Sequence, residues 1–122
     1  MIRSLSQTIT SHLYRQFAEQ LSDTGFQGDI ELSYADRTVL STDNSIYQVL
    51  PEGVVYPTST EDLSALLSLA HQPEFHSIVL SPRGGGTGTN GQSLTSGFMV
   101  DTSRYMNRVL EINAQELSLI HI

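Results

Sequence analysis

The stretch SPRGGGTGTNGQ, residues 81–92, holds the residue types best suited to binding chemistry. Five glycines lie between Gly84 and Gly91, the segment called the glycine loop below. Glycine permits backbone conformations with positive φ and lets a ligand approach the peptide N–H groups closely. Successive N–H groups turned to one side form a concave site for an anion, usually phosphate. A flexible connector or a tight turn between strands is the alternative interpretation of such a segment.

The surroundings of the glycine loop favour the anion site. The loop follows an apolar run, Ile78 to Leu80, and phosphate-binding loops commonly follow a buried strand. Residues 75–100 contain no Asp or Glu, although the rest of the chain carries all 13 acids. Arg83 is the one charged side chain within residues 81–92. Negative charge is therefore absent from the part of the chain that would meet an anion.

Two phosphate motifs match this segment by letter. Gly86, Gly88 and Gly91 fit the G-x-G-x-x-G pattern of dinucleotide sites, and the residues from Gly86 nearly fit a P-loop, with Gln92 where its lysine belongs. Both motifs need a helix to begin at the last glycine. Only six residues, 92–97, separate Gly91 from the strand expected next, whereas a helical crossover needs about 10–12. We therefore predict a strand–loop–strand site built from backbone N–H groups, without a helix dipole.

The residues before Gly53 predict an N-terminal helix followed by a less regular segment. Residues 4–22 carry apolar side chains at every fourth position, which is close to the helical period. The segment that follows has no clean period, and we expect short helical or irregular pieces there. Asp43 or Asn44 would cap a helix near residues 45–49.

From Gly53 onward the pattern is more regular. GVVYP, residues 53–57, has the composition of a strand. Residues 58–72 predict a helix that begins with capping-box spacing and ends before Pro73. Its apolar face is expected to comprise four residues, Leu63, Leu66, Leu67 and Ala70.

Three further strands are expected, at residues 77–81, 98–101 and 108–113. The first reads as a buried strand because its apolar residues are consecutive. The expected fold class is therefore α+β: an N-terminal helix followed by a βαβ unit with parallel strands and a further β segment.

Composition bounds the function. The chain has 122 residues, enough for one modest domain, and a formal charge of −7, which is a poor field for nucleic acid. It contains no cysteine, so disulfides and cysteine ligands to metals are absent from this stretch. Its four histidines lack metal-ligand spacing and are expected at the surface. With no signal peptide and no transmembrane segment evident, a cytoplasmic location is expected.

The glycine loop and its flanks carry a family resemblance. A strand, the run PRGGGTG and a short strand ending in Val-Asp resemble the flavin-binding domain of the vanillyl-alcohol-oxidase (PCMH) type. VVYPTSTEDLSALLSLA is similar to that family's opening strand and helix. SYADRTVLSTDNSIYQVLP and VDTSRYMNRVLEINAQE resemble the branch of large bacterial FAD and iron–sulfur dehydrogenases that oxidise D-2-hydroxyglutarate. The resemblance covers about residues 20–116 and implies an FAD-dependent oxidoreductase acting on the CH–OH group of a 2-hydroxyacid.

The resemblance also implies residue roles. Backbone N–H groups of the loop would wrap the pyrophosphate of FAD, with the cofactor-binding role falling on nine residues: Pro82, Arg83, Gly84, Gly85, Gly86, Thr87, Gly88, Asn90 and Gly91. The Thr87 hydroxyl would donate to a phosphate oxygen. Arg83 would either serve that site or pair with an acid such as Asp101. Some family members carry at the Thr87 position a histidine that attaches the flavin, so non-covalent FAD is implied here.

The resemblance further divides the chain into three parts. These are a leader at residues 1–52, the first part of the FAD-binding domain at 53–116, and a tail at 117–122 that departs from the family. The catalytic residues, the contacts to the small 2-hydroxyacid and the electron acceptor, and any iron–sulfur cluster would lie beyond residue 122. The chain alone is expected to bind FAD weakly. An FAD-linked oxidase or reductase of other specificity, or a non-enzymatic anion-binding module, is the alternative.

Overall fold

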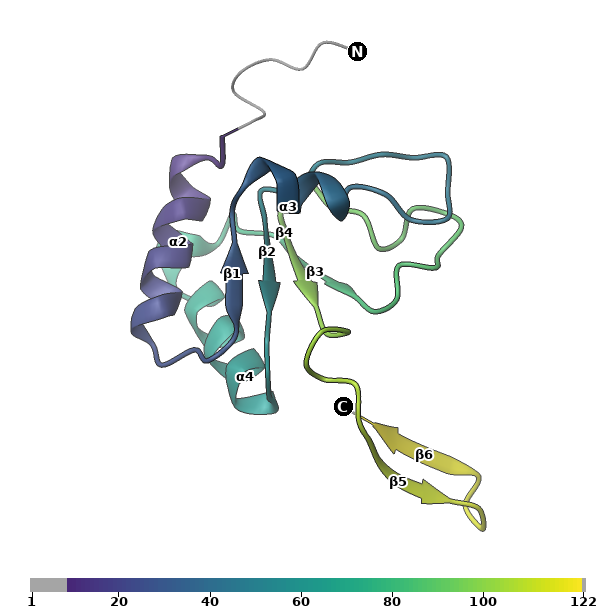
Figure 1. Cartoon of the computed structure of the whole chain (residues 1–122). Coiled ribbons are helices and arrows are strands. Elements are labelled where there is room, and N and C mark those ends of the chain that lie inside the picture. Colours follow the sequence, from purple (N-terminus) through teal and green to yellow (C-terminus); the bar gives the residue numbers. More distant parts are fainter. Residues whose placement is uncertain (1–8, 122) are drawn as a thin grey trace.

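A four-stranded mixed sheet lies at the centre of the computed structural model, which describes residues 9–121 (Figure 1). The strands follow one another across the sheet in the order β1 (Asp29–Glu31), β2 (Gly53–Tyr56), β4 (Phe98–Asp101) and β3 (Leu80–Arg83). β2, β4 and β3 run parallel, and β1 joins β2 antiparallel. The parallel strands predicted for the βαβ unit are confirmed, although β4 lies between the two strands of that unit.

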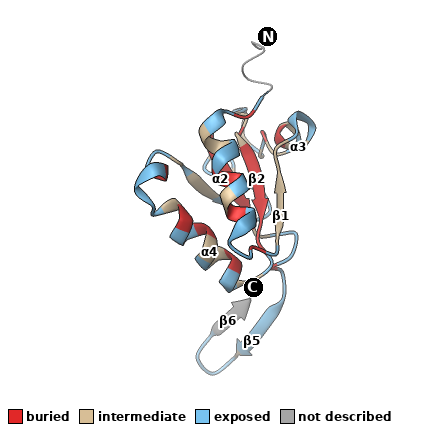
Figure 2. Cartoon of the chain, turned by 90° about the vertical axis from the view of Figure 1, so that its left-hand side faces the viewer, coloured by how far each residue is buried: buried red, intermediate tan, exposed pale blue. Residues whose placement is uncertain are grey.

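Two helices cover one face of the sheet. α2 (His12–Asp23) and α4 (Thr60–Ala70) turn their buried residues inward and their exposed residues to solvent (Figure 2). The core between helices and sheet centres on three aromatic rings: Phe17 contacts Phe98 and Phe75 edge-on, with ring centroids 5.7 and 5.1 Å apart. The predicted N-terminal helix is confirmed from residue 12, but residues 9–11 are not helical, and residues 4–8 of that prediction lie outside the described residues.

A buried carboxylate joins the start of α4 to the turn after α2. Ser59 caps the helix by accepting from the backbone N–H of Asp62 at 3.2 Å. The Asp62 carboxylate accepts in turn from the N–H of Gln27 and from the N–H and hydroxyl of Thr58, at 2.6–2.9 Å. Burial alone would raise the pKa of Asp62, but these hydrogen bonds outweigh it and hold the pKa below 3.8.

The apolar face predicted for α4 is wrong at one position. Leu67 is 60% exposed, whereas Leu69 is buried with Leu66. The helix is rotated so that Asp62, Leu66 and Leu69, spaced at i, i+4 and i+7, face inward, and the hydrogen bonds to Asp62 require this orientation. Leu63 and Ala70 lie partly buried beside them, as expected.

The strand predicted at residues 77–81 is shifted and less buried than expected. β3 begins at Leu80 and runs through Pro82 to Arg83, and Val79 is 51% exposed. A single turn of 3₁₀ helix, η1 (Pro73–Phe75), precedes it. β3 is an edge strand, which explains both differences: an edge tolerates proline, which cannot donate to a ladder, and leaves apolar residues partly open. β2 and β4 are fully buried and match their predicted ranges to within a residue.

The segment between Gly28 and Gly53 contains an unpredicted strand, β1, and a short helix, α3 (Tyr34–Val39), capped by Ser33. The helix predicted near residues 45–49 is absent. Asp43 accepts instead from the N–H of Ser45 at 2.7 Å, which forms a turn. Thr42 and Gln48 then pair in an isolated antiparallel bridge, so residues 42–48 form a closed loop, called the 42–48 loop below.

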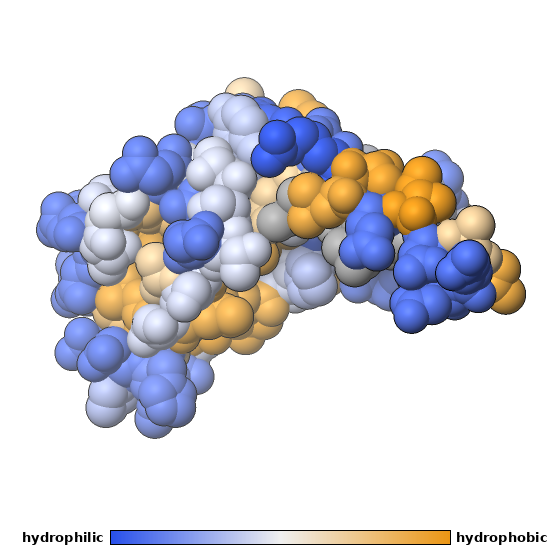
Figure 3. Space-filling view, turned by 90° about the horizontal axis from the view of Figure 1, so that it is seen from below, coloured by the Kyte–Doolittle hydropathy of each residue, from blue (hydrophilic) through white to orange (hydrophobic). Residues whose placement is uncertain are grey.

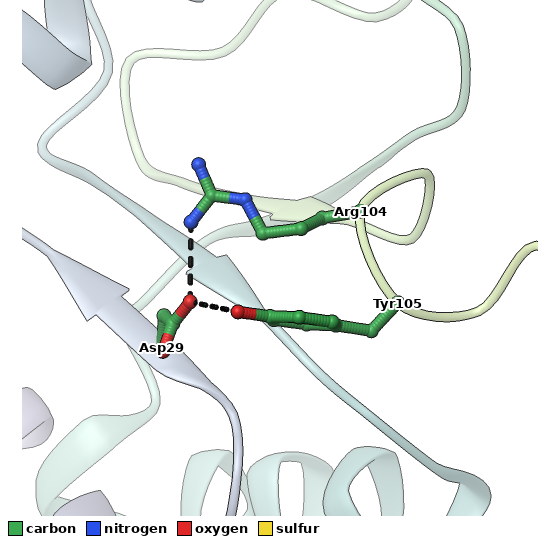
Figure 4. A network of polar contacts seen from close by, with 3 residues as sticks. All are labelled: Asp29, Arg104 and Tyr105. Carbon is green, nitrogen blue, oxygen red and sulfur yellow. Dashed lines mark hydrogen bonds and ion pairs between the residues drawn. The ribbon is translucent and has the colours of Figure 1, made fainter.

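A polar network closes the other side of the sheet near β1. Asp29 accepts from Arg104 at 3.1 Å and from the Tyr105 hydroxyl at 2.5 Å, and both partners come from the turn after β4 (Figure 4). The Arg104 guanidinium also lies 3.5 Å from the centre of the Tyr56 ring. The hydrogen bond to Tyr105 is the largest cause lowering the pKa of Asp29. The network fastens this turn to the edge strand of the sheet.

A hairpin of β5 (Val109–Asn113) and β6 (Ser118–His121) projects from the sheet (Figure 1). The strand predicted at 108–113 is thereby confirmed. Apolar side chains gather on the hairpin surface, among them Val109, Leu110, Ile112 and Leu117, all exposed (Figure 3). The predicted departure of residues 117–122 from the family, like the division of the chain at residue 52, stays a prediction.

Candidate functional site

The glycine loop joins the end of β3 to the start of β4 and lies beside the 42–48 loop (Figure 1). All nine residues assigned to cofactor binding from the sequence therefore belong to one continuous segment, residues 82–91. No helix follows the last glycine before β4, as the sequence spacing required. The site is thus a strand–loop–strand arrangement.

Most backbone N–H groups of the glycine loop have no acceptor among the described residues. Among the described residues, no protein acceptor takes the N–H groups of residues 84–89. Further along, the Asn90 N–H donates to the Gln92 side chain at 2.9 Å and the Leu94 N–H donates to the Gly91 carbonyl at 3.0 Å. A run of peptide N–H groups without protein partners must be met by solvent or by a ligand.

The carbonyl groups of the same peptides show which way these donors point. Asn44 donates its backbone N–H to the Gly88 carbonyl at 3.1 Å and its side-chain amide to the Thr87 carbonyl at 3.4 Å. In a trans peptide the N–H points away from the carbonyl that precedes it. The N–H groups of Gly88 and Thr89 are therefore directed away from the 42–48 loop, on the opposite side.

The glycines of the loop serve two different purposes. A Cβ at Gly84 would meet nothing within 4 Å, and one at Gly85 would meet only the Thr87 methyl group at 3.7 Å. The protein itself leaves room for a side chain at both positions. Gly86 and Gly91, by contrast, have φ of +68° and +75°, so the turn needs glycine there. The open space at Gly84 and Gly85 is what a close approach by a ligand requires.

Arg83 lies on the inner side of the loop. Its side chain is only 9% exposed, and its Nη2 donates to the Thr42 carbonyl at 2.9 Å. A Cβ on Gly86 would lie 2.2 Å from the same nitrogen, so the guanidinium packs directly against that glycine. The pairing of Arg83 with Asp101 considered from the sequence is wrong, because the Asp101 carboxylate accepts from the N–H and hydroxyl of Ser103 at 2.7 and 2.6 Å.

The 42–48 loop forms a second wall that the site residues chosen from the sequence did not include. Besides the contacts of Asn44, the ring of Tyr47 packs against Gly91, 3.1 Å from the position of a Cβ. Hydrogen bonding from the Ser45 side chain lowers the pKa of Asp43, and the positive charge of Arg83 adds to this effect. The Asp-Asn-Ser run was the available sequence signal, but it was read as a helix cap, and a local pattern does not say what such a segment packs against.

Three buried side-chain atoms of the described residues have no hydrogen-bond partner, and all lie in these two loops or within two residues of them: Arg83 Nη1, Asp43 Oδ2 and Ser93 Oγ. Buried polar atoms without partners are rare in proteins and often mark a site for a ligand or water. Free N–H donors, open space at two glycines and a buried guanidinium together fit a group that carries phosphate.

The described residues show no arrangement suited to catalysis or to metal binding. No group of three or more His, Asp or Glu side chains among residues 9–121 could hold a metal ion. His12, His71 and His76 are exposed, as expected; the side chain of His121 lies outside the description. Within the same residues, no helix has the length and apolar character needed to cross a bilayer.

Known proteins with similar sequences cover nearly the whole chain. D-2-hydroxyglutarate dehydrogenase of Pseudomonas putida KT2440 is 53% identical over 116 residues, which are 95% of this chain and 12% of that protein. The enzyme of the same name from Escherichia coli K12 is 54% identical over 85% of the chain. Glycolate oxidase subunit GlcD of Bacillus subtilis is 32% identical over 82%. The chain spans about a tenth of the length of the two dehydrogenases.

Solved structures share the fold at lower identity. An alkyldihydroxyacetonephosphate synthase aligns with 88% of this chain and 22% of its own, with a TM-score of 0.67 and 23% identity. BBE-like 1 of Physcomitrella patens aligns with 81% of the chain at a TM-score of 0.62 and 17% identity. The family model of the FAD binding domain matches residues 51–120, which include β2, α4, β3, the glycine loop, β4 and the hairpin. With that match over more than half of its length, the chain belongs to the FAD binding domain family.

Proposed function

We propose that this chain is the FAD-binding segment of a flavin-dependent D-2-hydroxyacid dehydrogenase and that its glycine loop holds the pyrophosphate of non-covalent FAD. The observation that carries the proposal is the run of free N–H groups at residues 84–89, on a loop with open space at Gly84 and Gly85. Pyrophosphate offers several charged oxygens close together, and backbone N–H groups are favourable donors to them.

The residues around the loop support this assignment in different ways. Gly84 and Gly85 let the phosphates approach the backbone, whereas Gly86 and Gly91 give the loop its turns. Thr87 is exposed and its methyl group lies near Gly85, which supports a role for its hydroxyl as a donor to a phosphate oxygen. Pro82 and Arg83 end the edge strand from which the loop departs, and the Asn90 N–H is already held by Gln92. Asn90 therefore helps to close the turn, and its backbone N–H is not among the donors proposed for phosphate.

Bound flavin supplies the acceptor for a hydride removed from the carbon that bears the hydroxyl group. The described residues contribute position, because none can be assigned as the base that takes the hydroxyl proton. The names of the relatives, at 53–54% identity, favour D-2-hydroxyglutarate or a similar small 2-hydroxyacid as the substrate. An electron acceptor, and any iron–sulfur cluster, would be served by parts of a longer protein.

The test separates binding from folding. Gly85→Val places a side chain in the open space in front of the loop, so it should weaken FAD binding at least about tenfold, as loss of several charge-assisted hydrogen bonds implies. Folding should be nearly unchanged because no protein atom is closer than 3.7 Å to the new Cβ. Titration with FAD, followed by NMR shifts of the backbone N–H groups of residues 84–89, detects even weak binding.

Gly25→Ala is the matched control. Gly25 has φ of +87° in the turn after α2, away from the glycine loop, so alanine should cost about 1–2 kcal/mol of stability without changing FAD binding. Equal FAD affinity in Gly85→Val and the unaltered chain would refute the assignment of the loop. So would FAD-induced shifts confined to residues outside the two loops.

A further inference from the structure

The unpartnered buried atoms around the glycine loop include one positive and one negative group. Arg83 contributes a donor, Nη1, and Asp43 contributes an acceptor, Oδ2. Leaving a polar atom buried without a partner is unfavourable, and more so when the group is charged. The positive charge of Arg83 acts on the Asp43 carboxylate and lowers its pKa, so the two groups lie close enough to interact.

The two side chains make no direct ion pair among the described residues. The other nitrogen of Arg83, Nη2, is engaged with the Thr42 carbonyl, one residue before Asp43. The other oxygen of Asp43, Oδ1, accepts from the N–H of Ser45. The Ser45 side chain and the Gly91 N–H also contribute hydrogen bonds to the Asp43 carboxylate. The atoms left over are Nη1 of Arg83 and Oδ2 of Asp43. A buried water molecule needs two to four polar partners, and one donor and one acceptor supply two of them.

We propose that Arg83 and Asp43 form a buried charged pair, bridged by a water molecule, that holds the glycine loop in the shape required by pyrophosphate. This inference rests on the proposed function and assigns Arg83 and Asp43 as positioning residues. Through the pair, the 42–48 loop is joined to the inner side of the glycine loop at Gly86, and through Asn44 it is joined to Gly88. Through this pair, a segment of the leader at residues 1–52 helps to shape the binding site.

The position of Arg83 argues against a direct contact with phosphate. Its Nη1 is buried, and its guanidinium packs behind Gly86, whereas Gly84 and Gly85 are exposed. The arginine therefore acts through the backbone that it supports. The placement of Arg83 also predicts the direction in which removing the charge of Asp43 changes anion binding. Removing a negative charge near an anion site should strengthen anion binding if the charge acts only by Coulomb repulsion. If Asp43 holds the loop in place, its removal should weaken binding.

The experiment compares Asp43→Asn, Arg83→Met and the double variant in the full chain. Asp23→Asn, at the exposed end of α2, removes the same charge far from the loops and is the matched control. Unfolding in urea measures stability, and NMR titration with inorganic pyrophosphate measures binding at residues 84–89. We expect Asp43→Asn to weaken pyrophosphate binding about tenfold, as expected for one disrupted buried charged group, and the control to leave it unchanged or slightly stronger.

The double variant tests whether Arg83 and Asp43 act as a pair. The losses of stability and of binding in the double variant should be smaller than the sums of the single losses, because each single change leaves the other charge unpaired. Tighter pyrophosphate binding in Asp43→Asn, or additive losses, would overturn the pair. Should the unaltered chain show no shifts with pyrophosphate, the proposed function fails, while additive or non-additive unfolding data still decide whether the pair exists. A variant too unstable to titrate is judged by the unfolding data and by the positions of the Gly86 and Gly88 signals without ligand.

Discussion

The two central strands and the two loops beside them treat their polar groups in opposite ways. β2 and β4 are buried throughout, pair with neighbours on both sides and place Phe98 against the rings of α2. Within the described part of the chain, six consecutive N–H groups of the glycine loop, those of residues 84–89, have no protein acceptor, and the buried side-chain atoms without partners lie in or next to the loops. The buried strands, whose polar groups pair with one another, stabilise the fold. The loops, whose polar groups lack protein partners, are where a ligand can bind.

The largest effect should come from the sheet. Phe98→Ala removes a fully buried ring that contacts Tyr14 and Phe17, so it should cost about 3–5 kcal/mol of unfolding free energy. Urea denaturation followed by circular dichroism measures this loss. Val79→Ala, at a half-exposed apolar residue just before the edge strand, should change stability by less than about 1 kcal/mol. Similar losses in the two variants would mean that the aromatic cluster is not the core.

A buried polar group within the stable region should show the next largest effect. Asp62 has its acceptors filled, unlike Asp43, so Asp62→Asn should cost about 2 kcal/mol near neutral pH. The pKa of Asp62 is lowered in the folded chain, so its contribution is present above the ordinary value of 3.8 and is lost as the pH falls through the lowered pKa. Unfolding measured across acidic pH should show the two proteins converging. A difference that stays constant down to the lowest pH would contradict the role of the carboxylate.

The smallest changes in stability are expected for substitutions in the glycine loop, and they should differ between its turn-forming and its ligand-facing glycines. Gly86→Ala introduces a Cβ at positive φ and against the buried guanidinium, so it should cost about 1–2 kcal/mol. Gly84→Ala meets open space and should change stability by no more than about 0.5 kcal/mol, while still weakening FAD binding. Thermal unfolding with and without FAD distinguishes these outcomes. Equal destabilisation by both changes would remove the distinction between turn-forming and ligand-facing glycines.

The sequence predicted the elements whose signals are local. β2, α4, β4 and the glycine loop follow from β-branched runs, capping spacing, helical period and glycine content. The exclusion of a helix after Gly91 followed from counting residues, and the structure confirms it. The burial of a strand was predicted less well, because it depends on the position of the strand in the sheet. The run from Ile78 to Leu80 reads as buried, yet β3 is an edge strand because β4 lies between β2 and β3.

The parts that could not be predicted depend on contacts between distant residues. β1 has three residues without alternation, and only its antiparallel pairing with β2 makes it a strand. Asn44 and Thr42 reach residues about 40 positions away in the chain, so no local pattern could identify the second wall of the site. For the same reason, Asp101 was a reasonable partner for Arg83 by charge and register, although the hydroxyl of Ser103 occupies its carboxylate.

The placement of α2 and β1 bears on where this polypeptide can be cut. The family match begins at residue 51, yet Phe17 and Leu21 fill the space over Phe98, and Thr10 donates its hydroxyl to the Glu52 carbonyl at 2.7 Å. A truncation at the edge of the match would strip one helix from the aromatic cluster and expose the side of β2. The residues that cover this face of the sheet therefore start about 40 residues upstream of the first residue matched by the family model.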